Sequence, residues 1–209
     1  MTKWVLLWVV AGPVAAQYWY PKHSFTAGAG AAQPRANLTG PLRDSAVLTL
    51  GYGYRLHRYF QADVGLDTIF YGARVRDFLD TRAFGPLRIR DYQFLIPFGG
   101  RVILPIDRGR FVVSAGGGGV RLQYAELLRQ PSEYFNLDCY VCGTRGGWGY
   151  YGLAGGSVAL DRRKHFRLGV TGKVYQGHTR GDPLGLLSVF RSRDRWANVA
   201  GEFGISFLS

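Results

Sequence analysis

A chain of 209 residues with a formal net charge of +12 and a mean hydropathy of -0.05 has the length of one domain. Beyond the N-terminus, no segment approaches the roughly 20 consecutive apolar residues of a transmembrane helix, which excludes a helical membrane protein. The cations are scattered over turns, loops and one strand face rather than gathered on a helix or an aromatic platform, which argues against nucleic acid as a partner.

The first 16 residues predict a signal peptide. Lys3 precedes an apolar core from Trp4 to Val10, Pro13 breaks any helix, and small residues at 14–16 suit a cleavage site before Gln17. An uncleaved anchor is the competing interpretation, but the apolar segment is shorter than a bilayer span. We therefore expect residues 1–16 to be removed and residues 17–209 to form one exported domain.

Residues 46–70, AVLTLGYGYRLHRYFQADVGLDTIF, contain two runs of strict alternation joined by a polar turn. In the first run, one face carries apolar side chains such as Leu48 and Leu50, whereas the other face carries Thr49 and Arg55. A period of two predicts strands. An apolar face opposite a face that holds charges is typical of strands that separate lipid from the lumen of a barrel.

The same pattern recurs along the chain. Strand-like runs lie near 24–32, 45–56, 59–71, 92–104, 110–124, 148–160, 165–178 and 195–207. Their connections alternate between tight polar turns and longer stretches, which is the layout of outer-membrane barrels. The sequence therefore predicts an all-β fold: an eight-stranded antiparallel up-and-down transmembrane β-barrel, with the short turns and both termini on the periplasmic side.

Two strands depart from a simple alternation. In FVVSAGGGGVRLQY, unbroken parity would place Arg121 on the same face as Val113, so we expect a β-bulge within 116–119 that turns Arg121 inward and Leu122 and Tyr124 toward lipid. A phosphate-binding glycine loop is a poor alternative because no helix-forming segment follows. The facing of the strand near 148–160 stays open.

The exported start, the eight alternating runs, the segments FLIPFGGRVILP and FVVSAGGGG, and the closing run from Trp196 to Phe207 resemble the OmpA-like eight-stranded outer-membrane β-barrel domain family. The resemblance covers the whole mature chain and rests on pattern. It implies a non-enzymatic outer-membrane protein that contributes to envelope integrity or surface interactions, with a small or gated pore as a further role. It also implies insertion by the outer-membrane assembly machinery. The family typically ends in an aromatic residue, whereas here Leu208 and Ser209 follow Phe207.

The candidate site is the predicted lumen face. An eight-stranded barrel has an interior only wide enough for side chains to fill, and charges buried there must pair. The residues predict either a plug of ion pairs and hydrogen bonds, which we favour, or a gated pore in which the same pairs rearrange. The candidate network consists of Arg55, Gln61, Asp63, Asp67, Arg101, Arg167, Lys173 and Glu202.

Cys139 and Cys142 lie in the sequence CYVC within a predicted long loop. In an exported protein they predict a local disulfide. A zinc site would need two further ligands, and a thioredoxin-like redox pair would need a βαβ setting, so neither is expected. The sequence predicts no metal and no cofactor.

Three alternatives and two partners complete the expectations. A lipid-active enzyme or a hydrophobic-ligand-binding barrel would use the outer loops around His178 and Asp182, but Arg180 stands where a His-x-Ser pair would need serine, so no enzyme is predicted. A soluble lipocalin-like barrel would carry its charges outside.

Excess cations at the barrel rims favour phosphate-bearing lipid headgroups as a partner, beside the assembly machinery. The oligomeric state stays open.

Overall fold

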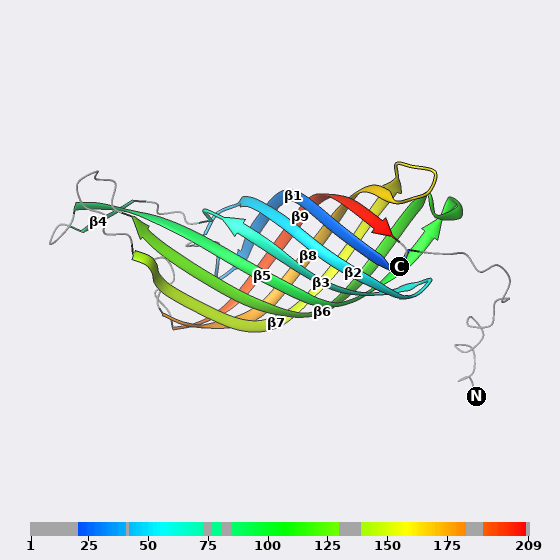
Figure 1. The fold of residues 1–209 in the computed structure, drawn as a ribbon. Helices are drawn as coiled ribbons and strands as arrows, with labels where there is room; N and C mark the ends of the chain where they lie inside the picture. Colours follow the sequence, from blue (N-terminus) through cyan, green and yellow to red (C-terminus); the bar gives the residue numbers. More distant parts are fainter. Residues whose placement is uncertain are drawn as a thin grey trace, which may run out of the picture.

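The protein folds into a closed, all-antiparallel β-barrel of eight strands (Figure 1). The computed structural model describes residues 21–40, 42–72, 77–80, 85–129, 139–182 and 190–207, with side chains in the two longer stretches described for 90–127 and 143–182. The elements are β1 (His23–Ala36), β2 (Ser45–His57), β3 (Phe60–Phe70), β4 (Asp77–Asp80), β5 (Gly85–Ile106), η1 (Asp107–Gly109), β6 (Phe111–Arg129), β7 (Cys139–Ala159), β8 (Phe166–Gly181) and β9 (Arg191–Phe207).

Each barrel strand pairs with the barrel strands that precede and follow it in the chain, and the first strand pairs with the last. β1 pairs with β9, and β3 pairs directly with β5. The short strand β4 pairs with the start of β5 outside the barrel wall, where Figure 1 shows it projecting from one end. In the described part of the chain, no helix has the length and apolarity to cross a membrane.

The two ends of the barrel differ, as the sequence predicts. The tight connections β2–β3, β5–β6 and β7–β8 lie at one end, together with the start of β1 and the end of β9, which pair at His23 and Phe207. The ends of β1, β3, β6 and β8 and the starts of β2, β5, β7 and β9 lie at the opposite end (Figure 1). We call these the short-turn end and the long-loop end.

A belt of apolar side chains surrounds the barrel. Leu50, Val64, Leu104, Val170 and Val199 point outward, with exposed fractions between 47% and 58%. The 11 residues of β3 begin and end at an apolar side chain, and at about 3.3 Å per residue and a tilt of about 45° they span a height of about 26 Å. That height matches the apolar band of outer-membrane barrels. The belt favours a membrane barrel over the lipocalin-like alternative.

Aromatic side chains border the belt at both edges. Phe25 stacks on Phe207 at 5.6 Å between ring centroids, and Phe166 stacks on Phe203 at 6.0 Å. Such girdles are characteristic of barrels whose edges meet the membrane-water interfaces. Exposed aromatic residues toward the long-loop end include Tyr71, Trp148, Tyr150 and Phe190.

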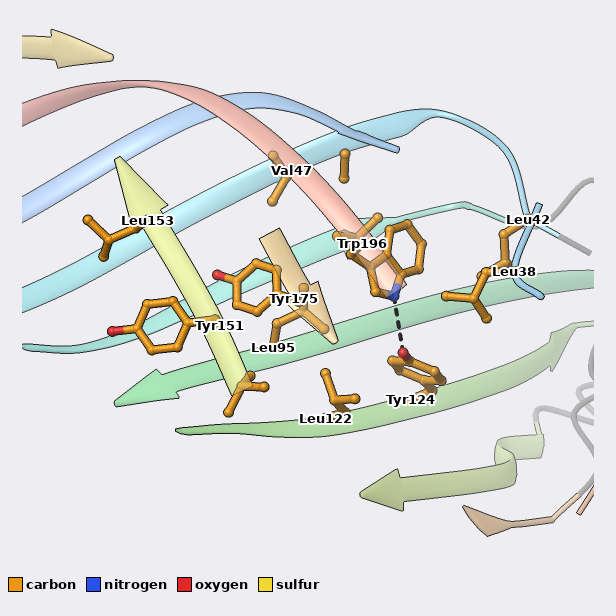
Figure 2. Close-up of a cluster of buried hydrophobic side chains, with 13 residues drawn as sticks. Leu38, Leu42, Val47, Leu95, Leu122, Tyr124, Tyr151, Leu153, Tyr175 and Trp196 are labelled. Carbon is orange, nitrogen blue, oxygen red and sulfur yellow. Dashed lines mark hydrogen bonds between the residues drawn. The ribbon is translucent and has the colours of Figure 1, made fainter. Parts of the chain in front are cut away.

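The lumen is partly apolar, which the sequence did not predict. Thirteen buried residues from the barrel strands and the β1–β2 connection form one hydrophobic cluster inside the barrel. Figure 2 shows Trp196, Tyr124 and Tyr175 within it, and the Trp196 indole Nε1 donates a hydrogen bond to the Tyr124 hydroxyl at 3.0 Å. Apolar and aromatic packing therefore fills part of the barrel interior.

The expected β-bulge at residues 116–119 is wrong. β6 pairs with β5 in unbroken register from Phe111 to Arg129. The glycines instead permit close strand approach, because a Cβ on Gly118 would lie 2.3 Å from the Phe98 carbonyl oxygen. Val120, Leu122 and Tyr124 consequently face the lumen. Arg121 stays outside, with its guanidinium 5.1 Å from the Trp148 ring centroid.

The structure also gives the facing of β7, which the sequence left open. Trp148 and Tyr150 are 61% and 59% exposed and point outward, whereas Tyr151 and Leu153 are buried in the lumen. β5, β6 and β7 extend beyond the predicted runs at the long-loop end. Alternation of polarity does not mark these extensions, because beyond the apolar belt both strand faces can carry polar residues.

Candidate functional site

Asp67 is the centre of the buried polar network in the lumen. Its carboxylate accepts hydrogen bonds from Lys173 Nζ at 2.8 Å, from the Tyr175 hydroxyl at 2.6 Å and from Asn198 Nδ2 at 3.3 Å. Lys173 also donates to the Thr49 hydroxyl at 2.9 Å. The carboxylate lies on β3 and its partners on β8 and β9, so the pair spans the lumen from one wall to another. Asp67 is only 1% exposed.

A second ion pair lies closer to the short-turn end. Arg101 Nε donates to Asp63 Oδ2 at 2.7 Å, and Gln61 donates to the other oxygen of the same carboxylate at 2.7 Å. Glu202 accepts from the Thr171 hydroxyl at 2.8 Å and lies 3.9 Å from the Lys173 ammonium. Six of the eight candidate residues therefore belong to two neighbouring clusters across the lumen.

Arg55 and Arg167 lie nearer the short-turn end. Arg55 is paired with Gln61 across the β2–β3 ladder. Arg167 donates to the Ser157 hydroxyl at 3.1 Å and to the carbonyl oxygens of Gly109 at 3.3 Å and Arg110 at 3.2 Å. Its hydrogen bonds therefore hold the β5–β6 turn against the wall of the barrel.

Both arginines line a cavity of about 420 Å³ inside the short-turn end, which we call the basic vestibule. Residues of the β2–β3, β5–β6 and β7–β8 turns contribute to its rim. Serine and threonine hydroxyls from several strands complete the lining. Its cationic residues are Arg55, Arg58, Arg101, Arg108, Lys164 and Arg167, and Glu202 is the only carboxylate among the described residues that line it.

A third polar cluster near the long-loop end escaped prediction. Asp194 accepts hydrogen bonds from Thr179 and Ser192, each at 2.5 Å, and Arg145 donates to Thr179 at 3.0 Å. All four residues are buried. The alternation of the last strand contains the signal, because Asp194 lies two residues before Trp196 and therefore on the same face. The predicted strand begins at residue 195, so it does not include Asp194.

Outside the barrel, five arginines form what we call the basic band. Arg180 and Arg191 are cross-strand partners between β8 and β9, and Arg35 and Arg195 are partners between β1 and β9. Arg193 lies between them on β9, directly opposite His178. All five arginines are exposed. On β9 the band begins at Arg195, about ten residues from Ile205 at the short-turn edge of the apolar belt, which is the length of a membrane-spanning strand.

The band has few internal partners for its charge. Arg35 donates to Gln33 at 2.5 Å and Arg195 donates to Gln176 at 2.9 Å, both neutral acceptors. Gln33 links Arg35 to Asp44, because its Nε2 donates a hydrogen bond to the Asp44 carboxylate at 3.2 Å. Within the described ranges, no carboxylate forms an ion pair with any of the five arginines. Like charges directly opposite on neighbouring strands destabilise a sheet.

No catalytic group surrounds His178 among the residues that the structure describes. The imidazole is exposed on the outer face of β8, and Asp182 accepts a hydrogen bond from the Thr144 amide at 3.4 Å rather than from the histidine. Ser192, on the neighbouring strand, points inward to Asp194. Among the described residues there is no cluster of His, Cys, Asp or Glu that could hold a metal ion.

The CYVC segment occupies a different place from the one predicted. β7 begins at Cys139, and the register with β6 shifts between Leu128, which pairs with Cys139, and Glu126, which pairs with Gly143. The segment is thus an irregular strand end rather than part of a loop. The Cys139 and Cys142 side chains, like residues 1–20, lie outside the described parts of the structure, so the disulfide and the signal peptide stay predictions.

Comparison with solved structures shows that the barrel fold is shared with a known protein. The crystal structure of Neisserial surface protein A (NspA) superposes with a TM-score of 0.56 at 11% identity, over 89% of this chain and 97% of that one. The outer membrane protein OprG from Pseudomonas aeruginosa gives 0.49 at 12% identity, over 91% and 98%, and Ail of Yersinia pestis gives 0.48 at 9%, over 88% and 97%. No family model and no curated protein matches the chain.

Proposed function

We propose that the protein is a non-enzymatic outer-membrane barrel that contributes to envelope integrity by binding phosphate-bearing headgroups of the outer leaflet. The basic band carries this proposal. Its five arginines lie at the upper edge of a lipid-facing belt, which is the depth at which headgroup phosphates lie. Arginine presents a planar fork of donors that suits phosphate oxygens, so each guanidinium can form charge-assisted hydrogen bonds there.

The energetic argument concerns the arginine pairs. Arg35 faces Arg195 and Arg180 faces Arg191, and each pair repels across the ladder. A phosphate between two such guanidinium groups would convert the repulsion into two attractive contacts. A merely solvated rim needs no such gathering of one sign on three adjacent strands. From this polarity we propose that the long-loop end faces the cell surface and that the short-turn end, with both termini, faces the periplasm.

The lumen supports a structural rather than a transport role. The Asp67 network and the hydrophobic cluster both occupy the barrel interior. We therefore propose that the ion pairs act as a plug and that the closed barrel presents its outer surface, not a pore, to its partners. We also propose that the protein belongs to the OmpA-like domain family, on the sequence pattern described above.

The test is the lipid that the protein retains. The full chain is extracted from outer membranes in mild detergent, and the bound phosphorylated lipid A is counted by native mass spectrometry. The triple variant Arg191→Gln, Arg193→Gln, Arg195→Gln should retain markedly less lipid A than the unmodified protein. The matched control carries Arg110→Gln, Arg162→Gln and Arg163→Gln, which removes the same charge from exposed positions at the short-turn end and should retain as much as the unmodified protein. Equal retention by both triple variants would contradict the proposal.

A further inference from the structure

The basic vestibule has an excess of positive charge that its own residues do not balance. Six cationic side chains line it against a single lining carboxylate, Glu202, among the described residues. Asp63 neutralises Arg101, and Glu202 lies 3.9 Å from Lys173, a cation that is not part of the lining. The five lining cations other than Arg55 therefore outnumber the carboxylates that interact with them, Asp63 beside Arg101 and Asp161 near Arg167.

The hydrogen bonds of Lys164 and Arg167 all go to neutral acceptors, and the nearby Asp161 offsets only part of the charge of Arg167. Lys164 donates to the Arg108 carbonyl oxygen, and Arg167 donates to the carbonyl oxygens of Gly109 and Arg110 and to the Ser157 hydroxyl. Neutral acceptors satisfy the hydrogen-bonding capacity of a cation without cancelling its charge. Cations gathered in a partly enclosed site are costly unless a counter-charge is present. A bound anion would supply it.

The cavity also has the size and donors of a ligand site. Its volume of about 420 Å³ lies within the range of small-molecule pockets. Lining hydroxyl groups add further hydrogen-bonding groups to the guanidinium groups, although Ser24 already donates to the Gly53 carbonyl oxygen and Thr171 to Glu202. The hydroxyl-bearing lining residues are Ser24, Thr26, Ser114, Ser157, Thr171 and Ser206.

We propose that the basic vestibule binds a phosphoryl group from the short-turn end. Converging guanidinium groups favour phosphate over singly charged anions, because the fork of each arginine can bind two oxygens and the dianion offers more charge. The buried network above the vestibule makes it a closed pocket, so the anion is bound rather than transported. The phosphoryl group can belong to a soluble phosphate ester or to a lipid headgroup at the same rim.

The experiment is a calorimetric titration of the full chain in phosphatidylcholine nanodiscs with inorganic pyrophosphate at constant chloride. Unmodified protein should show saturable binding. The double variant Arg58→Gln, Arg108→Gln removes two vestibule cations that lie on exposed turns, so folding is little affected. Loss of two charge-assisted contacts should weaken pyrophosphate binding about tenfold or more.

Two further variants separate a defined site from general attraction. The control Arg162→Gln, Arg163→Gln removes equal charge from the β7–β8 turn at the same end, but neither residue lines the cavity, and it should bind pyrophosphate as the unmodified protein does. Glu202→Gln keeps an oxygen acceptor for Thr171 while it removes the lining carboxylate, and it should bind pyrophosphate more tightly.

Nanodiscs that contain phosphatidylglycerol distinguish the sources of the phosphoryl group. If a lipid headgroup occupies the vestibule, apparent pyrophosphate affinity falls in these discs. If the apparent pyrophosphate affinity is the same in both kinds of disc, the natural ligand is a soluble anion. The proposal is overturned by a lack of saturable binding to the unmodified protein in phosphatidylcholine, by equal weakening in the two double variants, or by unchanged or weaker binding to Glu202→Gln.

Discussion

Replacement of Asp67 by asparagine tests the buried network most sharply. The substitution keeps the shape of the side chain and one acceptor oxygen, but it removes the negative charge that faces the Lys173 ammonium at 2.8 Å. Lys173 would then keep the Thr49 hydroxyl and Glu202 at 3.9 Å. Its ammonium would remain nearly buried without a carboxylate in direct contact.

Breaking a buried ion pair by removal of one partner typically costs about 3 to 5 kcal/mol. Because Thr49 and Glu202 remain, we expect the lower end, about 3 kcal/mol in the free energy of unfolding, which is on the order of a hundredfold in the folding equilibrium. The measurement is urea unfolding of the full chain in lipid vesicles. Asp182→Asn is the matched control, since this carboxylate is exposed and its loss should cost about 0.5 kcal/mol or less.

A double variant supplies the decisive comparison. Asp67→Asn combined with Lys173→Met removes both charges, so no unpaired ion remains, and it should be more stable than Asp67→Asn alone. If Asp67→Asn costs no more than the Asp182→Asn control, or if the double variant is less stable than the single variant, the reasoning on a buried charge pair is refuted.

Three other predictions address the belt, the cysteines and the lumen. Leu50→Arg and Val64→Arg each place a cation in the lipid-facing belt and should lower barrel stability by about 2 to 4 kcal/mol; normal membrane yield and unchanged urea midpoints would contradict this. Alkylation followed by intact mass should detect no free thiol at Cys139 or Cys142, and substitution of both should leave assembly nearly unchanged because the ring is small; two alkylated thiols would reject the disulfide. Single-channel recordings should show little steady conductance, whereas Asp63→Ala should leak or lose heat stability; a large, stable conductance of the unmodified protein would exclude the plug.

The sequence predicts the barrel and much of its lumen because alternation is a local signal. Parity alone places Asp67 and Lys173 on the inner face. It does not indicate that they meet, since they lie 106 residues apart in the chain and β3 and β8 are on separate walls. Only the closed ring brings these two side chains together.

Polarity does not decide which way a side chain faces in this barrel, because the lumen contains a hydrophobic cluster and the outer rim is basic. Arg121 therefore lies outside against Trp148, whereas Leu122 and Tyr124 lie inside. The close packing that explains Gly118 depends on the neighbouring Phe98 backbone, which no local pattern reveals.

Cell fractionation of the unmodified full chain, followed by gel electrophoresis with and without heating, tests the central claim most directly. A closed barrel leaves no unpaired strand edge, so it resists detergent until heated. We predict that the protein is recovered with outer membranes and that its unheated form migrates differently from its heated form. Recovery in the aqueous fraction without detergent, or identical migration before and after heating, would contradict it.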